Sequence, residues 1–255
     1  MDVAGSVIFL VTGISSVLAA AIMVGAGADP FASWQAVAWS FAAGVCEAGY
    51  FTLLVIAFRL APLGTVYTLS RGFAILAAWP LSVLWLGETV TPLSLGGTVV
   101  LLAGLAMNAV KVAASGRAIA VALTSGAFIA GYHLCYKLGI EHGGLPAAVF
   151  ALSLSVAVPV NLALLPAARR RVLLPVWRAR PVTLTALGVV CAASFLLILL
   201  ALESAGAGYV LTLRNASILF ALLLAWQMGE RLAPRQWLGA GLIAAGAVLL
   251  GLAEH

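Results

Sequence analysis

The chain has 255 residues, of which 64% are hydrophobic and only 8% are charged. An ordinary soluble domain carries about 25% charged residues, so this chain could not cover a water-exposed surface of its size. We therefore conclude that it is an integral membrane protein. The net charge of +5 comes from basic residues that collect in loops, which indicates a lipid bilayer rather than a nucleic acid as partner.

Nine apolar segments are long enough to cross a bilayer as helices, which takes about 20 residues each. Their apolar runs are continuous rather than alternating, which favours helices over strands. The predicted spans are 4–25, 34–57, 65–86, 93–110, 119–138, 147–165, 182–202, 207–228 and 236–252. The longest and most basic of the loops between them runs from Pro166 to Pro181. The sequence thus predicts an all-α membrane protein with about nine transmembrane helices.

The basic residues are distributed unequally between the two sides of the membrane that these spans define. Of the thirteen, only Lys137 falls on the side away from the N-terminus, and Arg71 and Arg214 lie within spans. The other ten lie on the side of the N-terminus: Arg59, Lys111, Arg117, Arg169, Arg170, Arg171, Arg178, Arg180, Arg231 and Arg235. Because positive residues accumulate in cytoplasmic loops, we predict a multi-pass cell-membrane protein with a cytoplasmic N-terminus and an outer C-terminus.

One helical unit occurs twice in the chain, at an offset of 142 residues. Self-similarity at a fixed offset indicates a fold built from internal repeats. Equivalent helices are five apart, an odd number, so they should cross the membrane in opposite directions, as in inverted-repeat transporters. We assign residues 1–116 to a first repeat of four helices and residues 117–255 to a second of five, and we expect the first repeat to lack one helix. The matched positions include Tyr67 and Tyr209, Glu88 and Glu230, Pro92 and Pro234, Gly97 and Gly239, and Gly104 and Gly246.

An ionisable residue within a span costs roughly 2.5–3.5 kcal/mol on the insertion scale, so each one suggests a functional role. Glu47 lies near the middle of the span 34–57, and Tyr50 follows in the same segment. A carboxyl group in this position could exchange a proton or pair with a cationic substrate. The alternative role is a structural hydrogen bond to a neighbouring helix.

Two arginines lie inside the repeated unit, Arg71 and Arg214, each about six residues or roughly 9 Å from the start of its helix. In oppositely directed helices they could meet an anionic substrate from either side of the membrane. Alternatively, each side chain snorkels to its nearer interface. Asn215, Tyr67 and Tyr209 could donate or accept hydrogen bonds to a polar ligand, although tyrosines near helix ends are also ordinary interface anchors.

Two further features of the repeat have structural interpretations. Glu88 and Glu230 follow a glycine at the end of a helix, where a carboxylate is expected to bond a loop or the N-terminus of the next helix. The glycines seven residues apart should share one helix face and permit close helix contact. These are Gly97 with Gly104, and Gly239 with Gly246.

Catalytic and metal-binding motifs are absent from the sequence. It contains no Ser/His/Asp set, HExxH zinc helix or phosphate-binding loop, and its three cysteines have neither disulfide nor metal-ligand spacing. We predict that the protein is not an enzyme and uses no cofactor or metal.

The segments VYTLSRGFAILAAWPLSVLWLGE and RNASILFALLLAWQMGERLAPRQWLGAGLIAAGAVLL resemble the two EamA domains of the drug/metabolite transporter superfamily. The resemblance implies ten helices in two inverted five-helix repeats and transport of metabolites such as amino acids or related small solutes, in some cases by export. We expect this chain to depart from that pattern by lacking the counterpart of the first helix.

We predict that the protein moves a small metabolite or drug-like solute by alternating access. The candidate substrate-binding residues are Glu47, Tyr50, Tyr67, Arg71, Tyr209, Arg214 and Asn215. One alternative is a flippase for a lipid-linked or amphipathic substrate, which an apolar slot between helices would favour over a polar cavity. The others are a non-transporting membrane protein and an intramembrane enzyme.

Overall fold

The structure is a computed structural model, and it describes residues 10–18, 20–21, 29–108, 115–227 and 233–253. These residues form helices joined by short connections, with one isolated antiparallel bridge between Phe31 and Gly144. Residues 10–18 are helical. The helices that follow are α2 (Trp34–Leu60), α3 (Leu63–Leu86), α4 (Pro92–Asn108), α5 (Gly116–Glu141), α6 (Pro146–Leu164), α7 (Ala167–Ala179), α8 (Pro181–Ser204), α9 (Ala207–Arg214), α10 (Ser217–Gln227) and α11 (Pro234–Ala253).

The prediction of an all-helical membrane protein is confirmed. Six of the described helices have the length and hydropathy of a membrane span, namely α2, α3, α5, α6, α8 and α11. The helix α4 is shorter, and the span predicted at 207–228 is divided into α9 and α10. The total of nine spans and the inverted repeat stay predictions. Half of the first predicted span, together with Lys111, Gly229, Glu230 and Arg231, lies outside the described residues.

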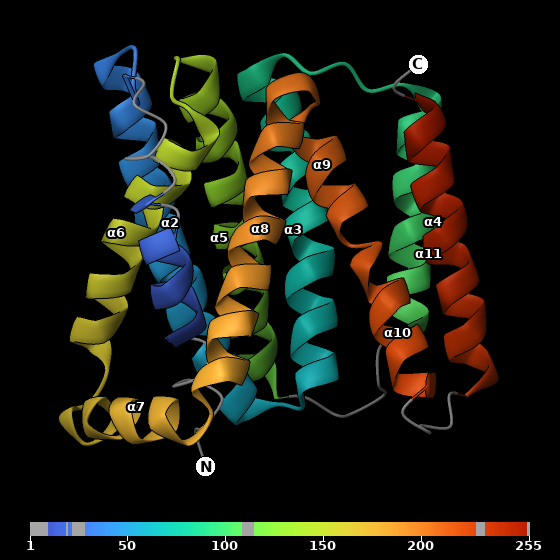
Figure 1. The fold of residues 1–255 in the computed structure, drawn as a ribbon. Coiled ribbons are helices and arrows are strands. Elements are labelled where there is room, and N and C mark those ends of the chain that lie inside the picture. The colour runs from blue at the N-terminus through green and yellow to red at the C-terminus, as the bar shows by residue number, and fades with distance from the viewer. Residues whose placement is uncertain (1–9, 19, 22–28, 109–114, 228–232, 254–255) are drawn as a thin grey trace. The chain divides into compact units, whose positions relative to one another are not determined.

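The segment that we predicted to be the longest loop is a helix instead. The helix α7 follows Pro166. Its apolar residues Leu173 and Trp177 lie one turn apart, which is the spacing at which two side chains share a helix face. The helix has only 13 residues, too few to cross a bilayer, so its length does not predict a membrane span. Figure 1 shows α7 lying crosswise to α6 and α8, which precede and follow it in the chain. The Arg170 side chain ties it to α6 by donating to the carbonyl oxygens of Leu165 (2.9 Å) and Ala163 (2.7 Å).

The chain forms two compact units. Unit 1 comprises Met1–Val55 and Gly131–Ser204, and unit 2 comprises Ile56–Ala130 and Ala205–His255. Within unit 1, the Ser15 hydroxyl donates to the carbonyl oxygen of Gly188 at 2.9 Å, which joins the helical segment 10–18 to α8. A Cβ on Gly188 would lie 2.5 Å from the Ile14 side chain, so this approach requires glycine.

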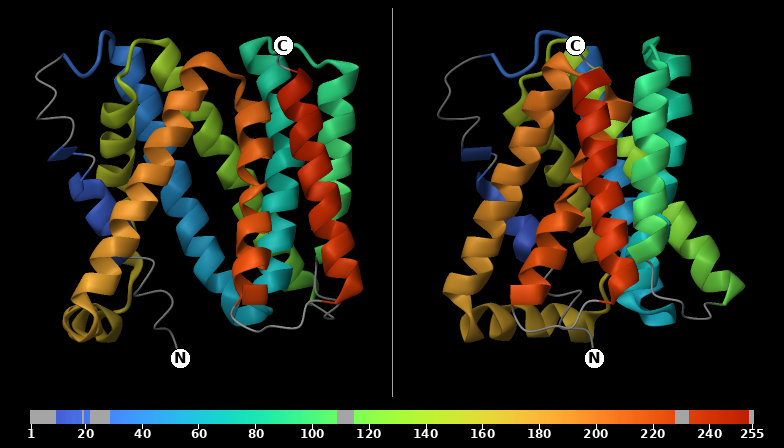
Figure 2. Two further views of the ribbon diagram at one scale, coloured as in Figure 1. Left: turned by 45° about the vertical axis from the view of Figure 1, so that its right-hand side comes forward. Right: turned by 90° about the vertical axis from the view of Figure 1, so that its right-hand side faces the viewer.

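In unit 2, α4 and α11 pack side by side through the predicted glycines (Figures 1 and 2). A Cβ on Gly246 would lie 2.7 Å from the carbonyl oxygen of Gly97, and one on Gly104 would lie 2.6 Å from that of Gly239. Position 97 therefore meets 246 while 104 meets 239, so the two helices run antiparallel. The prediction that these glycines permit close helix contact is confirmed. Around them lies an apolar core that includes Ile75, Leu101, Leu105, Ile243 and Leu250.

Candidate functional site

Glu47 is buried in unit 1 among three helices. It lies on α2, and only 1% of its surface is exposed. The Tyr136 hydroxyl on α5 donates to Glu47 Oε1 at 2.6 Å, and the Ser153 hydroxyl on α6 donates to Oε2 at 2.6 Å. The two hydroxyl oxygens are 3.3 Å apart, so the three side chains form a closed ring of polar contacts.

This ring can hold one proton or release it. It contains three contacts, whereas the hydroxyls of Tyr136 and Ser153 together carry only two protons. With Glu47 ionised, both hydroxyls donate to the carboxylate and no proton is left for the contact between them. With Glu47 protonated, the acid supplies the third proton and all three contacts become hydrogen bonds. The geometry therefore accommodates both forms of Glu47.

Small residues one or two turns from the ring bring the three helices together. A Cβ on Gly44 would lie 2.5 Å from the Ser153 carbonyl oxygen, and one on Gly131 would lie 3.3 Å from the Cys46 sulfur. The ring is also bordered by aromatic side chains. Tyr132 packs between Tyr136, at 5.5 Å between ring centroids, and Tyr50, at 5.9 Å.

The second polar feature is the interruption between α9 and α10 in unit 2 (Figure 2). At the interruption, the amide of Asn215 donates to the Thr212 carbonyl at 3.0 Å, three residues back instead of the four of an α-helix. The Leu211 carbonyl thereby loses its regular donor. Asn215 Nδ2 replaces that donor at 2.8 Å.

The other side-chain atom of Asn215 is an unused acceptor. Asn215 is 1% exposed, and its Oδ1 has no hydrogen-bond partner in the described part of the chain. A buried acceptor without a donor costs free energy, about 1–3 kcal/mol, so it requires an explanation. Its position at a break within an apolar span is typical of substrate sites in transporters with discontinuous helices.

A polar cavity of about 450 Å³ lies at the N-terminal end of α9, also in unit 2. Its lining includes Trp79, Glu88 and Tyr209. The Glu88 carboxylate accepts the first amides of α9, from Ala207 at 2.6 Å and Gly208 at 3.4 Å. Its charge thus complements the positive end of the helix dipole.

A second connection between α3 and α9 borders this cavity. Trp79 Nε1 donates to the Thr212 hydroxyl oxygen at 3.1 Å, and that hydroxyl donates to the Gly208 carbonyl at 2.7 Å. Glu88, which follows α3, therefore fixes the first turn of α9, and Trp79 of α3 fixes its last turn, just before the break at Asn215.

We expect Glu88→Ala to destabilise the protein by about 1–2 kcal/mol, because it leaves the first amides of α9 without an acceptor. Glu88→Gln keeps one acceptor oxygen and should lose less than half of that free energy. Thermal unfolding in detergent, followed by tryptophan fluorescence, would measure both variants. Equal melting of Glu88→Ala and the unmodified protein would contradict a capping role.

The seven predicted site residues are divided between the two units. Glu47 and Tyr50 belong to unit 1. In unit 2, the Arg71 guanidinium lies 5.1 Å from the Tyr67 ring centroid, a cation–π contact within α3. Tyr209 lines the polar cavity, whereas Arg214 ends α9 and Asn215 lies at the break. A polar cavity lined by Arg71, Arg214 and Asn215 would favour a metabolite over a lipid, but the lining of the polar cavity at the start of α9 includes none of these three residues.

Sequence reasoning missed the partners of Glu47 and the connection from Trp79 to Thr212. Tyr136 and Ser153 are 89 and 106 residues from Glu47 along the chain, and no spacing rule relates them to it. The expectation for Glu88 is confirmed in kind, since its carboxylate does bond a helix N-terminus. That helix is α9, however, rather than α4, which follows Glu88 in sequence.

Long apolar helices with buried carboxyl and amide groups inside them define a multi-pass helical membrane protein. Residues 116–252, more than half of the chain, match the EamA-like transporter family. The chain therefore belongs to that family. One solved crystal structure, described only as that of a protein, is similar with a TM-score of 0.74 and 18% identity, covering 98% of this chain and 89% of that one. At this identity the similarity establishes a shared fold.

Proposed function

We propose that the protein carries a small polar organic solute across the cell membrane by alternating access. The observation that carries this proposal is the buried, unused acceptor of Asn215 at the break between α9 and α10. Antiparallel packing of α4 against α11, which are equivalent in the two sequence repeats, supports an inverted repeat. An inverted repeat allows one site to open to each side of the membrane in turn.

The chemistry at the break favours a solute with a hydrogen-bond donor. Asn215 Oδ1 can only accept, so a hydroxyl, amide or ammonium group would satisfy it. Arg214 is the adjacent residue and could meet a carboxylate on the same solute. These two requirements together describe a small zwitterion or hydroxy acid, which belongs to the metabolite class.

Glu47 supplies a means of coupling transport to protons. Its ring with Tyr136 and Ser153 has a complete hydrogen-bond arrangement in the protonated form and keeps both short bonds in the ionised form. A group that changes charge inside an apolar unit favours different surroundings in its two states, and proton uptake can thereby shift the balance between conformations.

We expect Asn215→Ala to raise the KM for the solute about tenfold, the effect of losing one hydrogen bond of about 1.4 kcal/mol. Uptake into proteoliposomes across a panel of amino acids and organic acids would identify the solute and give its KM. Ser125→Ala is a matched control, because the Ser125 hydroxyl is also buried without a partner in the described part of the chain but lies on α5. An unchanged KM in well-folded Asn215→Ala would remove Asn215 from the site.

A further inference from the structure

An apolar cavity of about 510 Å³ lies in unit 1 between α7 and the helical segment 10–18. Every residue that lines it is apolar. They include Leu10, Ile14 and Val17 from the segment and Leu173, Leu174 and Trp177 from α7. Because no polar group faces this space, a polar solute would lose its hydration there without compensation. The cavity is therefore suited to a hydrocarbon chain.

The helix α7 places positive charge beside this cavity. Between Pro166 and Pro181 there are five arginines and no acidic residue. Arg171 and Arg178 are exposed, and they lie on the same side of α7, because seven residues make almost two full turns. In the described part of the chain neither side chain has a hydrogen bond or an ion pair, whereas Arg170 is used to cap α6.

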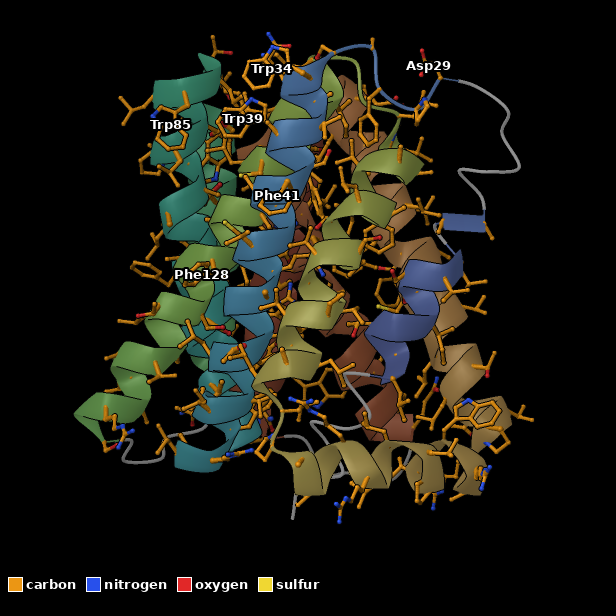
Figure 3. All side chains as sticks on the ribbon, turned by 90° about the vertical axis from the view of Figure 1, so that its left-hand side faces the viewer. Asp29, Trp34, Trp39, Phe41, Trp85 and Phe128 are labelled. Atoms are coloured by element: carbon orange, nitrogen blue, oxygen red, sulfur yellow. The ribbon has the colours of Figure 1, made fainter. Side chains whose placement is uncertain are left out.

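The orientation of α7 is that of a helix lying in a membrane interface. It lies crosswise to α6 and α8, and in unit 1 it is at the end opposite Asp29 and Trp34 (Figures 1 and 3). A short amphipathic helix with arginines lies in the plane of the interface, with its apolar face toward the acyl chains. On α7, Arg171 and Arg178 lie on a different side from Leu173 and Trp177. The loop charges predict that this interface is the cytoplasmic one, where anionic lipids attract such residues.

We propose that α7 and the helical segment 10–18 form a binding site for one anionic phospholipid. One acyl chain fills the apolar cavity, and the headgroup phosphate lies at the guanidinium groups of Arg171 and Arg178. A soluble anion satisfies the arginines but leaves the cavity empty, and a neutral lipid satisfies the cavity but not the arginines. Only an amphipathic anion complements both features.

The test is native mass spectrometry of the full chain released from nanodiscs of phosphatidylcholine and phosphatidylglycerol. We expect one phosphatidylglycerol to be retained in preference to phosphatidylcholine. Arg171→Gln with Arg178→Gln should weaken that retention about 25-fold, because each arginine near an anionic lipid surface contributes about fivefold. Arg59→Gln with Arg117→Gln removes the same charge elsewhere and should leave retention unchanged.

A second variant tests the cavity separately from the charge. A Cβ on Gly13, which also lines the cavity, would meet nothing within 4 Å, so a side chain can start from this position and Gly13→Phe should occupy part of the space. We expect this variant to melt like the unmodified protein and to lose the retained lipid.

Three results would overturn the proposal. Retention of both lipids alike would remove the role of the arginines. Undiminished retention in Gly13→Phe would show that no acyl chain occupies the cavity. If no lipid is retained at any composition, the cavity belongs to another occupant, such as a polypeptide segment.

Discussion

Gly246→Leu will unfold or severely destabilise the protein, with a loss of about 3 kcal/mol or more. Overpacking a well-packed site usually costs 1–3 kcal/mol, because side chains move aside to make room. Here the obstacles are the Gly97 carbonyl oxygen and the Leu101 amide nitrogen, each 2.7 Å from the added Cβ. Both belong to the backbone of α4, so only separation of the two helices could relieve the contact. Gly104→Leu should behave in the same way, because it meets the backbone of Gly239 and Ile243.

Two nearby glycines provide controls for this prediction. A Cβ on Gly241 in α11, or on Gly96 in α4, would meet no atom within 4 Å. Leucine at either position should change the free energy of unfolding by no more than about 0.5 kcal/mol, as is usual for substitutions away from packed sites. Size-exclusion chromatography after stepwise heating in detergent would report all four variants. Similar melting of Gly246→Leu and Gly241→Leu would contradict the antiparallel packing of α4 and α11.

Glu47→Gln will abolish the response of transport to a pH gradient while leaving the protein folded. A glutamine resembles the protonated acid, since it presents one acceptor oxygen and a donor to Tyr136 and Ser153, but it cannot release a proton. For one coupled proton, a gradient of one pH unit is worth about 1.4 kcal/mol, or about tenfold accumulation of solute. We expect that accumulation to fall to about onefold in Glu47→Gln, while solute exchange at equal pH continues.

Two further variants separate coupling from stability. Glu203→Gln removes an exposed carboxylate at the end of α8 and should leave the pH response intact. Glu47→Leu should be unstable, because the hydroxyls of Tyr136 and Ser153 can then bond only each other and one of them stays buried without an acceptor, at about 1–3 kcal/mol. A pH response in Glu47→Gln equal to that of the unmodified protein would remove Glu47 from coupling and leave it a structural role.

The helices could be predicted from the sequence because membrane spans follow from length and hydropathy. The helix α2, for example, was expected at 34–57 and is observed at Trp34–Leu60. The pairing of glycines seven residues apart was also predictable, because two turns return to the same helix face. The helix α7 was not predicted. The segment between Pro166 and Pro181 contains five arginines, which is typical of a loop, and α7 is too short to be identified as a transmembrane span.

The site was predicted only in part, for a physical reason. Glu47 and Asn215 could be singled out because polar groups within apolar spans are costly wherever they occur. Their surroundings depend on tertiary packing, which the local sequence does not encode. Nothing in the residues around Asn215 predicts a break, because the interruption consists of a change in hydrogen-bond partner from Leu211 to Thr212 that the Asn215 side chain stabilises.

The most direct measurement is solute uptake into proteoliposomes that contain the purified full chain, with and without a pH gradient. A panel of radiolabelled amino acids, hydroxy acids and cationic dyes would cover the chemistry that Asn215 and Arg214 can recognise. We predict saturable uptake of at least one small polar solute, with a KM that rises in Asn215→Ala and not in Ser125→Ala. If correctly folded protein moves no member of the panel faster than empty liposomes do, the proposal that it is a carrier of small polar solutes is contradicted.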